Sequence, residues 1–460
     1  MPDLVLSDMQ HAGVNAISKW HRTAGGVRFI QEENVFYLAG YAGTGKTSIL
    51  PYIIDDCGLD YSEVAFCAPT GKAAKVMTGK LRQVYGPNVT AKTIHSTIYI
   101  PITQRVEMIK QQLDVIEAAI YRHEGGEAAL KDQKALHRLA LDPESGSLGE
   151  LARQYIEMEE AFDEALDARN GEGPSFMINP DSNVRNSRLI VVDEASMVGE
   201  DIASDLLSFD IPILAIGDPA QLPPVGDKPG FTDADPDFFL TEIHRQARDN
   251  PIIRLSMDVR DGKLIKPGRM GDQVRIVRRR DDEWTLNRDY DAQVICGTHK
   301  KRWRLTSEIR EMCGYSTTGP DVDEPLMVFK NSKKIPGLVN GSFVTCIESP
   351  GDLTDGHAAF DMVIETEEGI QHRVRANQGQ FEEHFLKQKE GATAPKMKAF
   401  DSRRRDEILD WGWVITAHKS QGSQWDNVIV HDESGVFRND ADRWLYTAVT
   451  RAANELTVVV

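Results

Sequence analysis

Short apolar runs alternate with segments of helical spacing through the first hundred residues and again after residue 183. Each run is five or six residues long and is bounded by glycine or polar residues. Continuous short runs of this kind are typical of strands that are buried on both faces of a parallel sheet. The pattern therefore predicts an α/β domain formed by residues 1–102 and 183–235. Its expected strands are 34–39, 63–68, 97–101, 188–192 and 211–216.

The segment 103–182 interrupts this alternation with heptad spacing. Apolar residues recur at intervals of three and four from Val106 to Ile120, and again from Leu148 to Phe162. Leu130–Leu141 also favours a helix, and glycine and proline residues separate the three stretches. The spacing predicts an antiparallel helical hairpin inserted into the first domain. Such an insertion is either a packed appendage or an arm that contacts DNA or a partner protein.

A second α/β domain is expected from residues 236–325 and 400–460, with strands at 292–297, 412–417, 427–431 and 456–460. Between them, residues 326–376 change to short strands separated by turn signals such as Asn340-Gly341. This change predicts a small β-barrel-like insertion within 326–399. The fold class is therefore α/β, with two domains that each contain an insertion.

The residues Gly40–Thr47 read Gly-Tyr-Ala-Gly-Thr-Gly-Lys-Thr between a predicted strand and a predicted helix. This is the arrangement of a P-loop, in which backbone N–H groups and the helix N-terminus cradle phosphates. Lys46 is expected to reach the β- and γ-phosphates, and Thr47 to place its hydroxyl on Mg²⁺. The predicted ligand is ATP with Mg²⁺, and the nucleotide-binding residues of the loop are Gly43, Thr44, Gly45, Lys46 and Thr47.

Acidic and amide side chains follow two later strands. Asp193 and Glu194 end the run 188–192, where Asp193 is expected to hold Mg²⁺ and Glu194 to polarise the attacking water. Gln221 follows the run 211–216 and is positioned to sense the γ-phosphate. The planar guanidinium of arginine suits phosphate oxygens, so Arg245 and Arg451 are candidate fingers from the second domain.

Composition limits the class of protein. With 41% hydrophobic and 27% charged residues, the sequence is that of an ordinary globular protein. No apolar run is long enough to span a membrane and no signal peptide is apparent, so we expect a cytoplasmic protein. The net charge is −18, but half of that excess lies in 103–182, which carries 17 acidic and 8 basic residues. The acidity lowers the expectation of DNA binding without excluding it. Five scattered cysteines favour buried free thiols.

The order of these motifs resembles that of the superfamily 1B helicases of the RecD-like and Dda-like group. Ser7–Gln10 is similar to the motif that reads adenine, Gly40–Thr47 to motif I, and Asp193–Ser196 to motif II. The remaining matches are Ala68–Ala74 (motif Ia), Thr93–Ser96 (Ib), Gly217–Pro224 (III), Glu242–Gln246 (IV), Thr416–Ser423 (V) and Tyr446–Ala452 (VI).

The resemblance implies two RecA-like domains with ATP between them, an SH3-like insertion in the second domain, and movement along single-stranded DNA in the 5′→3′ direction. It adds Gln10 and Gly422 to the nucleotide-binding residues. By motif, it also implies a set of residues that bind the DNA strand. They are Pro69, Thr70, Lys72, Thr93, His95, Thr416, His418 and Lys419.

The function expected from the sequence is an ATP-dependent DNA helicase or translocase whose partners are single-stranded and forked DNA. Its acidic insertion is expected to bind a replication or recombination protein. Three other classes remain open at this point. They are an RNA helicase of the same superfamily, a P-loop ATPase that serves as a scaffold without translocating, and a nuclease subunit.

Overall fold

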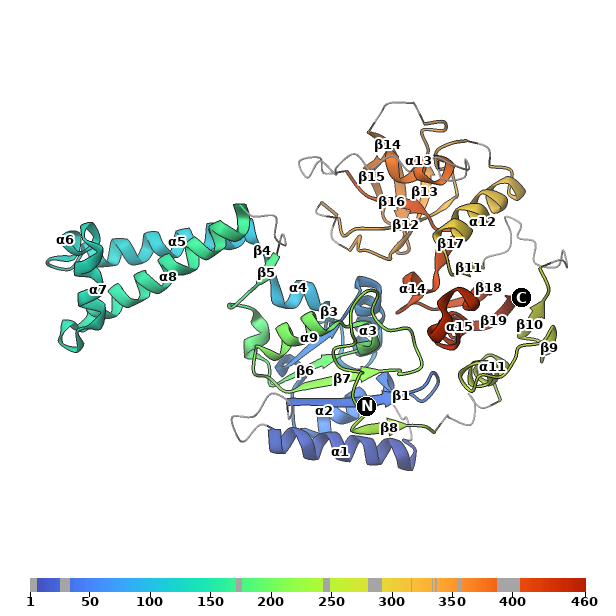
Figure 1. The fold of residues 1–460 in the computed structure, drawn as a ribbon, viewed down its shortest axis with the longest axis horizontal. Helices are drawn as coiled ribbons and strands as arrows, with labels where there is room; N and C mark the ends of the chain where they lie inside the picture. The colour runs from blue at the N-terminus through green and yellow to red at the C-terminus, as the bar shows by residue number, and fades with distance from the viewer. Residues whose placement is uncertain are drawn as a thin grey trace. The chain divides into compact units, whose positions relative to one another are not determined.

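The computed structural model describes residues 6–24, 34–170, 176–242, 249–279, 292–315, 317–332, 334–335, 337–353, 358–386 and 406–460. It divides into two compact units, one formed by Met1–Ile94 with Asn186–Val460 and the other by His95–Arg185. The larger unit contains two six-stranded sheets and one five-stranded sheet (Figure 1). The mixed α/β class predicted from the sequence is confirmed.

The first sheet is parallel throughout, in the order β3-β2-β6-β7-β1-β8. Every residue of its central strands β6 and β7 is buried, which explains their continuous apolar sequences. Its strands are β1 (Val35–Gly40), β2 (Val64–Ala68), β3 (Lys92–Thr93), β6 (Leu189–Val192), β7 (Ile213–Gly217) and β8 (Phe238–Leu240).

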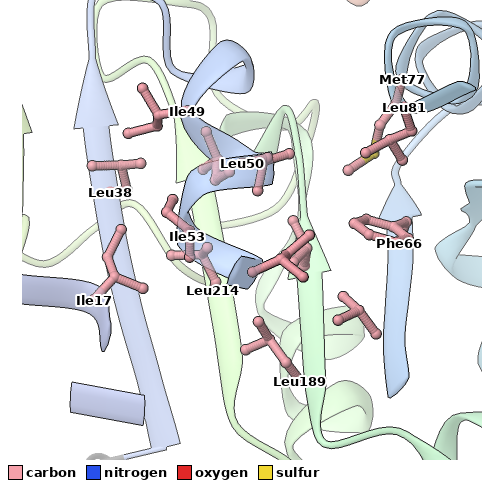
Figure 2. Close-up of a cluster of buried hydrophobic side chains, with 14 of the residues drawn as sticks. Ile17, Leu38, Ile49, Leu50, Ile53, Phe66, Met77, Leu81, Leu189 and Leu214 are labelled. Atoms are coloured by element: carbon pink, nitrogen blue, oxygen red, sulfur yellow. The ribbon is translucent and has the colours of Figure 1, made fainter. Parts of the chain in front are cut away.

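Three helices form the hydrophobic core against one face of this sheet. Figure 2 shows Leu50 and Ile53 from α2 (Leu50–Asp56) between Leu38 of β1 and Leu214 of β7, and all four are fully buried. Burying one such side chain contributes about 1.5–3 kcal/mol to stability. The other two helices are α1 (Asp8–Ala24) and α3 (Gly71–Tyr85), which supply Ile17, Met77 and Leu81.

The first sheet differs from the prediction at two places. The run 97–101 is not one of its strands, because Ile94–Ile98 forms a helix, α4, in which Ile94 and Ile98 are buried one turn apart. Only Tyr99–Pro101 is extended, as β4, and it pairs outside this sheet. In addition, β8 lies beyond residue 235 and still pairs with β1, so the sheet continues past the expected end of the first domain.

The second sheet has the order β17-β11-β18-β19-β10-β9 and is parallel except at β9, an antiparallel edge strand. Its strands are β9 (Gly268–Met270), β10 (Val274–Val277), β11 (Gln293–Cys296), β17 (Val414–Thr416), β18 (Trp425–His431) and β19 (Ala452–Val459). Its helices are α11 (Pro251–Arg260), α12 (His299–Met312), α14 (Ala417–Ser420) and α15 (Ala441–Val449). Trp444 of α15 is fully buried in the core against this sheet.

An antiparallel five-stranded sheet has the order β15-β14-β13-β12-β16. Its strands are β12 (Pro325–Val328), β13 (Phe343–Glu348), β14 (Ala359–Thr366), β15 (Gln371–Asn377) and β16 (Leu409–Trp411), and α13 (Gln378–Leu386) packs on it. β16 lies after residue 399, where the sequence indicated the second α/β domain. Its Trp411 is fully buried.

The chain passes from β16 to β17 through only Gly412 and Trp413, so the five-stranded sheet joins directly to the second parallel sheet. A buried carboxylate holds this junction. Glu324 accepts hydrogen bonds from the indoles of Trp411 (3.1 Å) and Trp413 (2.9 Å) and forms an ion pair with Arg310 (2.8 Å). Breaking a buried ion pair costs about 3–5 kcal/mol, so the junction is firmly held.

The smaller unit contains two long helices, α5 (Ile102–Tyr121) and α8 (Gly146–Asn170), which lie side by side (Figure 1). Ile109 of α5 packs with Met158 and Phe162, and Ile120 packs with Leu148. The segment expected as one helix, Leu130–Leu141, is divided at Asp132, whose carboxylate caps the second helix. The elements between the long helices are α6 (Gly126–Lys131) and α7 (Gln133–Leu141), and β4 pairs with β5 (Phe176–Ile178).

No helix in the described part of the chain is both long and apolar enough to cross a bilayer.

Candidate functional site

The loop after β1 has the geometry of a phosphate cradle. Gly43 and Gly45 adopt positive φ angles of 80° and 78°, which side chains with a Cβ rarely adopt. The ammonium of Lys46 donates hydrogen bonds to the carbonyls of Gly40 (2.6 Å) and Tyr41 (3.0 Å). These two bonds hold the positive charge over the loop, where it can meet a phosphate.

The acidic pair after β6 lies beside this loop, because β6, β7 and β1 are parallel neighbours and their carboxyl ends meet at one edge. The Thr47 hydroxyl lies 3.3 Å from Asp193 Oδ2. Burial, followed by the neighbouring charge of Glu194, raises the pKa of Asp193 above its usual range. Glu194 has a left-handed backbone with φ 55°. Such strained conformations cluster at functional sites.

The loop after β7 supplies a second carboxylate and an amide. Asp218 is fully buried, and its Oδ2 lies 3.9 Å from the Lys46 ammonium. Burial raises the pKa of Asp218. Gln221 is also buried, and its side-chain oxygen meets no donor within the described residues. An amide with a free acceptor in this position can receive a hydrogen bond from a ligand or a water molecule.

Gln10 reaches the same loop from α1. Its amide nitrogen donates to the carbonyl of Thr44 (3.2 Å), and its amide oxygen accepts from the N–H of Ser7 (3.1 Å). A cavity of about 560 Å³ lies beside this turn and is lined by Met9, Ala12, Phe238 and Thr241, among others. A partly apolar cavity of this kind suits a flat ring next to the phosphate cradle.

Side chains of the second sheet touch these loops directly. The Tyr446 hydroxyl accepts a hydrogen bond from the N–H of Ala42 (2.9 Å) and donates one to Asp218 Oδ2 (2.8 Å). Thr447 accepts from the N–H of Leu222 (2.9 Å), and the amide of Gln421 donates to the carbonyl of Leu222 (2.9 Å). The segments matched to motifs I and III are therefore in contact with those matched to motifs V and VI.

The two candidate arginine fingers have different outcomes. Arg451 is buried, and its guanidinium donates hydrogen bonds to the carbonyls of Thr447 (3.0 Å) and Ser423 (3.2 Å). In this structure it therefore binds backbone next to the strands of the second sheet. Arg245 lies outside the described residues. Two arginines that the sequence analysis did not select, Arg260 and Arg443, line a cavity of about 230 Å³ with Tyr41 and Tyr446.

Two of the residues expected to bind the strand, Thr70 and Lys72, lie around the start of α3 together with Gly422, which was expected to bind the nucleotide. The Thr70 hydroxyl caps this helix by accepting from the N–H of Ala73 (3.2 Å). The Lys72 ammonium lies 4.7 Å and 4.6 Å from the ring centroids of Phe343 and Trp425, and burial lowers the pKa of Lys72. A Cβ on Gly422 would lie 3.3 Å from Thr70 Oγ1, which places Gly422 against α3.

The remaining strand-binding candidates follow two other strands. Thr416 caps α14 as Thr70 caps α3 (3.4 Å), and burial lowers the pKa of His418. Lys419 donates to Asn340 (3.4 Å). Thr93 pairs with Ala68, so it lies beside the strand end that leads to Pro69. His95 belongs to the smaller unit, where its ring lies 5.0 Å from that of Tyr99.

Glu433 is a further polar residue that the sequence analysis did not select. It follows β18, and its carboxylate accepts hydrogen bonds from the N–H groups of Gly297 (2.8 Å) and Thr298 (3.0 Å) at the start of α12. The Thr298 hydroxyl donates to the same carboxylate (3.1 Å). The acidic pair Asp432-Glu433 after a buried strand was the available signal, because it repeats the pattern of Asp193-Glu194.

The glycine loop, lysine, threonine and strand-terminal carboxylates together have the arrangement of a P-loop. Two family models match the chain, one for an AAA domain over residues 24–227 and one for a UvrD-like helicase C-terminal domain over residues 412–459. The resemblance to superfamily 1 helicases is confirmed by these matches, which include motifs I to III and motifs V and VI.

Individual relatives agree with the family models. The ATP-dependent RecD2 DNA helicase of Deinococcus radiodurans is 31% identical over 291 residues, 57% of this chain and 35% of the relative. The uncharacterized protein R530 of Acanthamoeba polyphaga mimivirus is 26% identical over 199 residues, 42% of this chain and 30% of the relative. The chain thus matches about a third of the length of these curated relatives.

A similar solved structure is the Pif1 helicase from Candida albicans, with 17% identity and a TM-score of 0.47 over 99% of this chain and 94% of that one.

Proposed function

We propose that this chain is an ATP-dependent DNA helicase or translocase that moves along single-stranded DNA and unwinds duplex. The observation that carries the proposal is the contact between the P-loop site of the first sheet and Tyr446, Thr447 and Gln421 of the second sheet. Since the phosphate loop is held by both sheets, binding and loss of nucleotide can change how the sheets move against each other.

In the proposed reaction, water attacks the γ-phosphorus of ATP, and the bond from that phosphorus to the β–γ bridging oxygen breaks. Glu194 takes the proton of the attacking water, and Gln221 orients that water through its free amide oxygen. Lys46 stabilises the negative charge on the β- and γ-phosphates. Gln10, beside the cavity at α1, is assigned to the adenine.

The pair Thr47 and Asp193 fits Mg²⁺, because two oxygens 3.3 Å apart can occupy neighbouring positions around an ion that prefers oxygen ligands at about 2.0–2.1 Å. The ion, when bound, neutralises phosphate charge. Thr47 and Asp193 would orient it through their oxygens, directly or through water.

We assign strand binding to Pro69, Thr70, Lys72, Thr93, His95, Thr416, His418 and Lys419. Hydroxyl groups and cations at helix N-termini suit the phosphates of a strand without reading its sequence. The family resemblance supports 5′→3′ movement. Forked DNA is the proposed unwinding substrate.

We also propose two RecA-like domains, an SH3-like β insertion within 326–399 and an inserted helical hairpin within 103–182. The acidity of this segment disfavours DNA, so its proposed partner is a replication or recombination protein. Five buried cysteines without disulfides support a cytoplasmic location.

The first experiment is steady-state ATPase activity of the full chain at low salt, with and without single-stranded DNA, and with RNA of the same sequence. We expect DNA to stimulate hydrolysis strongly and RNA to stimulate it weakly. Equal stimulation by RNA would favour an RNA helicase, and a rate that ignores both strands would favour an ATPase scaffold. Tailed duplexes with 5′ or 3′ overhangs then test the direction of unwinding.

A further inference from the structure

One hydroxyl group joins the two sheets at the nucleotide site. Tyr446 lies on α15 and is 1% exposed. Its oxygen accepts a hydrogen bond from the N–H of Ala42, in the phosphate loop, at 2.9 Å. The same group donates its hydrogen to Asp218 Oδ2 at 2.8 Å. A phenol has one hydrogen to donate, so this donation fixes how the hydroxyl is oriented between the two loops.

Asp218 connects this hydroxyl to the catalytic side chains. Its Oδ1 accepts from the N–H of Ala220 (3.0 Å), and its carbonyl accepts from the N–H of Gln221 (3.1 Å). Its Oδ2 also lies 3.9 Å from the Lys46 ammonium. The carboxylate therefore fixes the loop that carries Gln221 and faces the lysine of the phosphate loop.

The other contacts from the second sheet act on a different part of this loop. Thr447 and Gln421 both bind the backbone of Leu222, through its N–H and its carbonyl respectively. These two contacts hold the loop that follows Gln221. Tyr446 is different because one of its atoms touches both the phosphate loop and Asp218.

We propose that the Tyr446 hydroxyl is a positioning group that aligns the phosphate loop with the Gln221 loop for ATP hydrolysis, and that makes this alignment depend on the second sheet. The proposal rests on the ATPase activity proposed above. When α15 shifts relative to the first sheet, the hydroxyl must release Ala42 and Asp218 together. The orientation of Gln221 towards the attacking water is then lost in the same step.

The proposal predicts an effect on kcat that exceeds the effect on KM. Tyr446→Phe keeps the ring in the core and removes only the oxygen. Lys46 and the loop N–H groups still bind phosphates, so we expect the KM for ATP to change less than about threefold. The attack is misaligned, and misplacement of this kind costs up to about 100-fold. We therefore expect DNA-stimulated kcat to fall about tenfold.

Two further variants complete the experiment. Tyr85→Phe is the matched control, because the Tyr85 hydroxyl binds the carbonyl of Pro51 (3.4 Å) on another helix of the first sheet. Its kcat and KM should equal those of the wild type. Asp218→Asn tests the route, since the amide cannot accept at both positions as the carboxylate does. If the hydroxyl acts through Asp218, the double variant should be no slower than the slower single variant.

The measurements are kcat and KM with saturating single-stranded DNA, and the melting temperature of each variant. A kcat loss in Tyr446→Phe with a nearly constant KM and no additivity with Asp218→Asn supports the inference. Wild-type kcat in Tyr446→Phe would overturn it. A lower kcat together with a raised KM and a lowered melting temperature would also overturn it, because these changes indicate a structural role only. If Tyr446→Phe does not fold, folded Asp218→Asn tests the route alone, and wild-type kcat in that variant would overturn the inference. A wild-type chain without DNA-stimulated hydrolysis would instead remove the proposed function itself.

Discussion

In both parallel sheets an acidic pair follows a buried strand, but the carboxylates of the two pairs have different partners. In the first sheet, a central strand ends in Asp193-Glu194 beside the glycine loop, and no carboxylate among the described residues accepts a hydrogen bond from the N–H groups of Gly43–Thr47. In the second, β18 leads to Asp432-Glu433, and the carboxylate of Glu433 binds the N–H groups of Gly297 and Thr298 at the start of α12. The helix start after the glycine loop is available for an external anion. The start of α12 already binds the carboxylate of Glu433.

This difference shows how one architecture can give a single catalytic edge. Parallel strands followed by helices always direct backbone N–H groups towards the same edge of the sheet. Whether that edge becomes a ligand site depends on whether a carboxylate of the chain already occupies it. In the second sheet Glu433 does so, which leaves that sheet to supply contacts such as Tyr446 to the site of the first.

The largest effect is expected at the open edge, from Lys46→Ala. Loss of the ammonium removes the charge that meets the phosphates, so we expect hydrolysis to fall by at least about 1,000-fold and nucleotide affinity to fall with it. Steady-state ATPase activity and binding of a fluorescent nucleotide measure the two effects. Lys19→Ala, on the exposed surface of α1, should match the wild type. Full activity in Lys46→Ala would refute the site.

Glu194→Gln separates chemistry from binding at the same edge. The amide retains the shape of the side chain but cannot accept the proton, so we expect kcat to fall on the order of 100-fold while the chain still binds ATP. Single-turnover hydrolysis and nucleotide binding test this, with Glu200→Gln on the surface as control. A parallel loss of binding and turnover would contradict the role of Glu194 as the base.

Glu433→Ala opens the second edge. It leaves the Gly297 and Thr298 N–H groups without their acceptor, which should cost about 1–3 kcal/mol of unfolding free energy in a urea titration. Because the helix start becomes free, sulfate should stabilise this variant more than it stabilises the wild type. ATPase activity should remain within twofold. Exposed Glu455→Ala is the control, and equal sulfate effects in all three proteins would show that this edge binds no anion.

The last effect concerns pH and the strand that precedes Glu433. Burial lowers the pKa of His431 from 6.5 to about 3. Below pH 6.5 the His431 imidazole therefore binds a proton in the unfolded chain but not in the folded chain. The free energy of unfolding, which is highest above pH 6.5, decreases as the pH falls towards 3. The expected slope is about 1.4 kcal/mol per pH unit.

Unfolding free energies of the wild type and His431→Gln at pH 8, 7, 6 and 5 measure this slope. The variant should follow the wild type between pH 8 and 7 and lose less stability than the wild type below pH 6.5. Identical slopes down to pH 5 would show that His431 does not titrate in this way.

Much of both parallel sheets could be predicted, because their central strands are short apolar runs that are buried on both faces. The strand predicted at 188–192 is β6, and that at 427–431 lies within β18. Partner choice could not be predicted. Leu409–Trp411 is a short buried strand like its neighbours, and nothing local indicates that it pairs with β12 rather than with the second sheet. The strand predicted at 97–101 was wrong at Thr97 and Ile98, which end helix α4, because a short run of this kind fits both periods.

The residues of the candidate site that belong to local motifs could also be predicted from the sequence. Lys46, Thr47 and Asp193 belong to motifs whose spacing has a physical reason, and the fold brings Thr47 within 3.3 Å of Asp193. Tyr446 was missed as a site residue because a tyrosine in an apolar helix indicates core packing, and it is indeed buried. Its hydroxyl gains significance only from Ala42, some 400 positions away, a pairing that no local pattern encodes.

The junction at Glu324 has a mechanical consequence. Gly412 and Trp413 alone separate β16 from β17, and the buried carboxylate binds both flanking tryptophans and Arg310. A connection so short and so tightly held cannot stretch or swivel like a flexible tether. A load applied to the five-stranded sheet is therefore transmitted along the backbone into β17 and Thr416 with little slack. The two sheets should respond to pulling as one stiff lever, and force spectroscopy should find that they yield together rather than in turn.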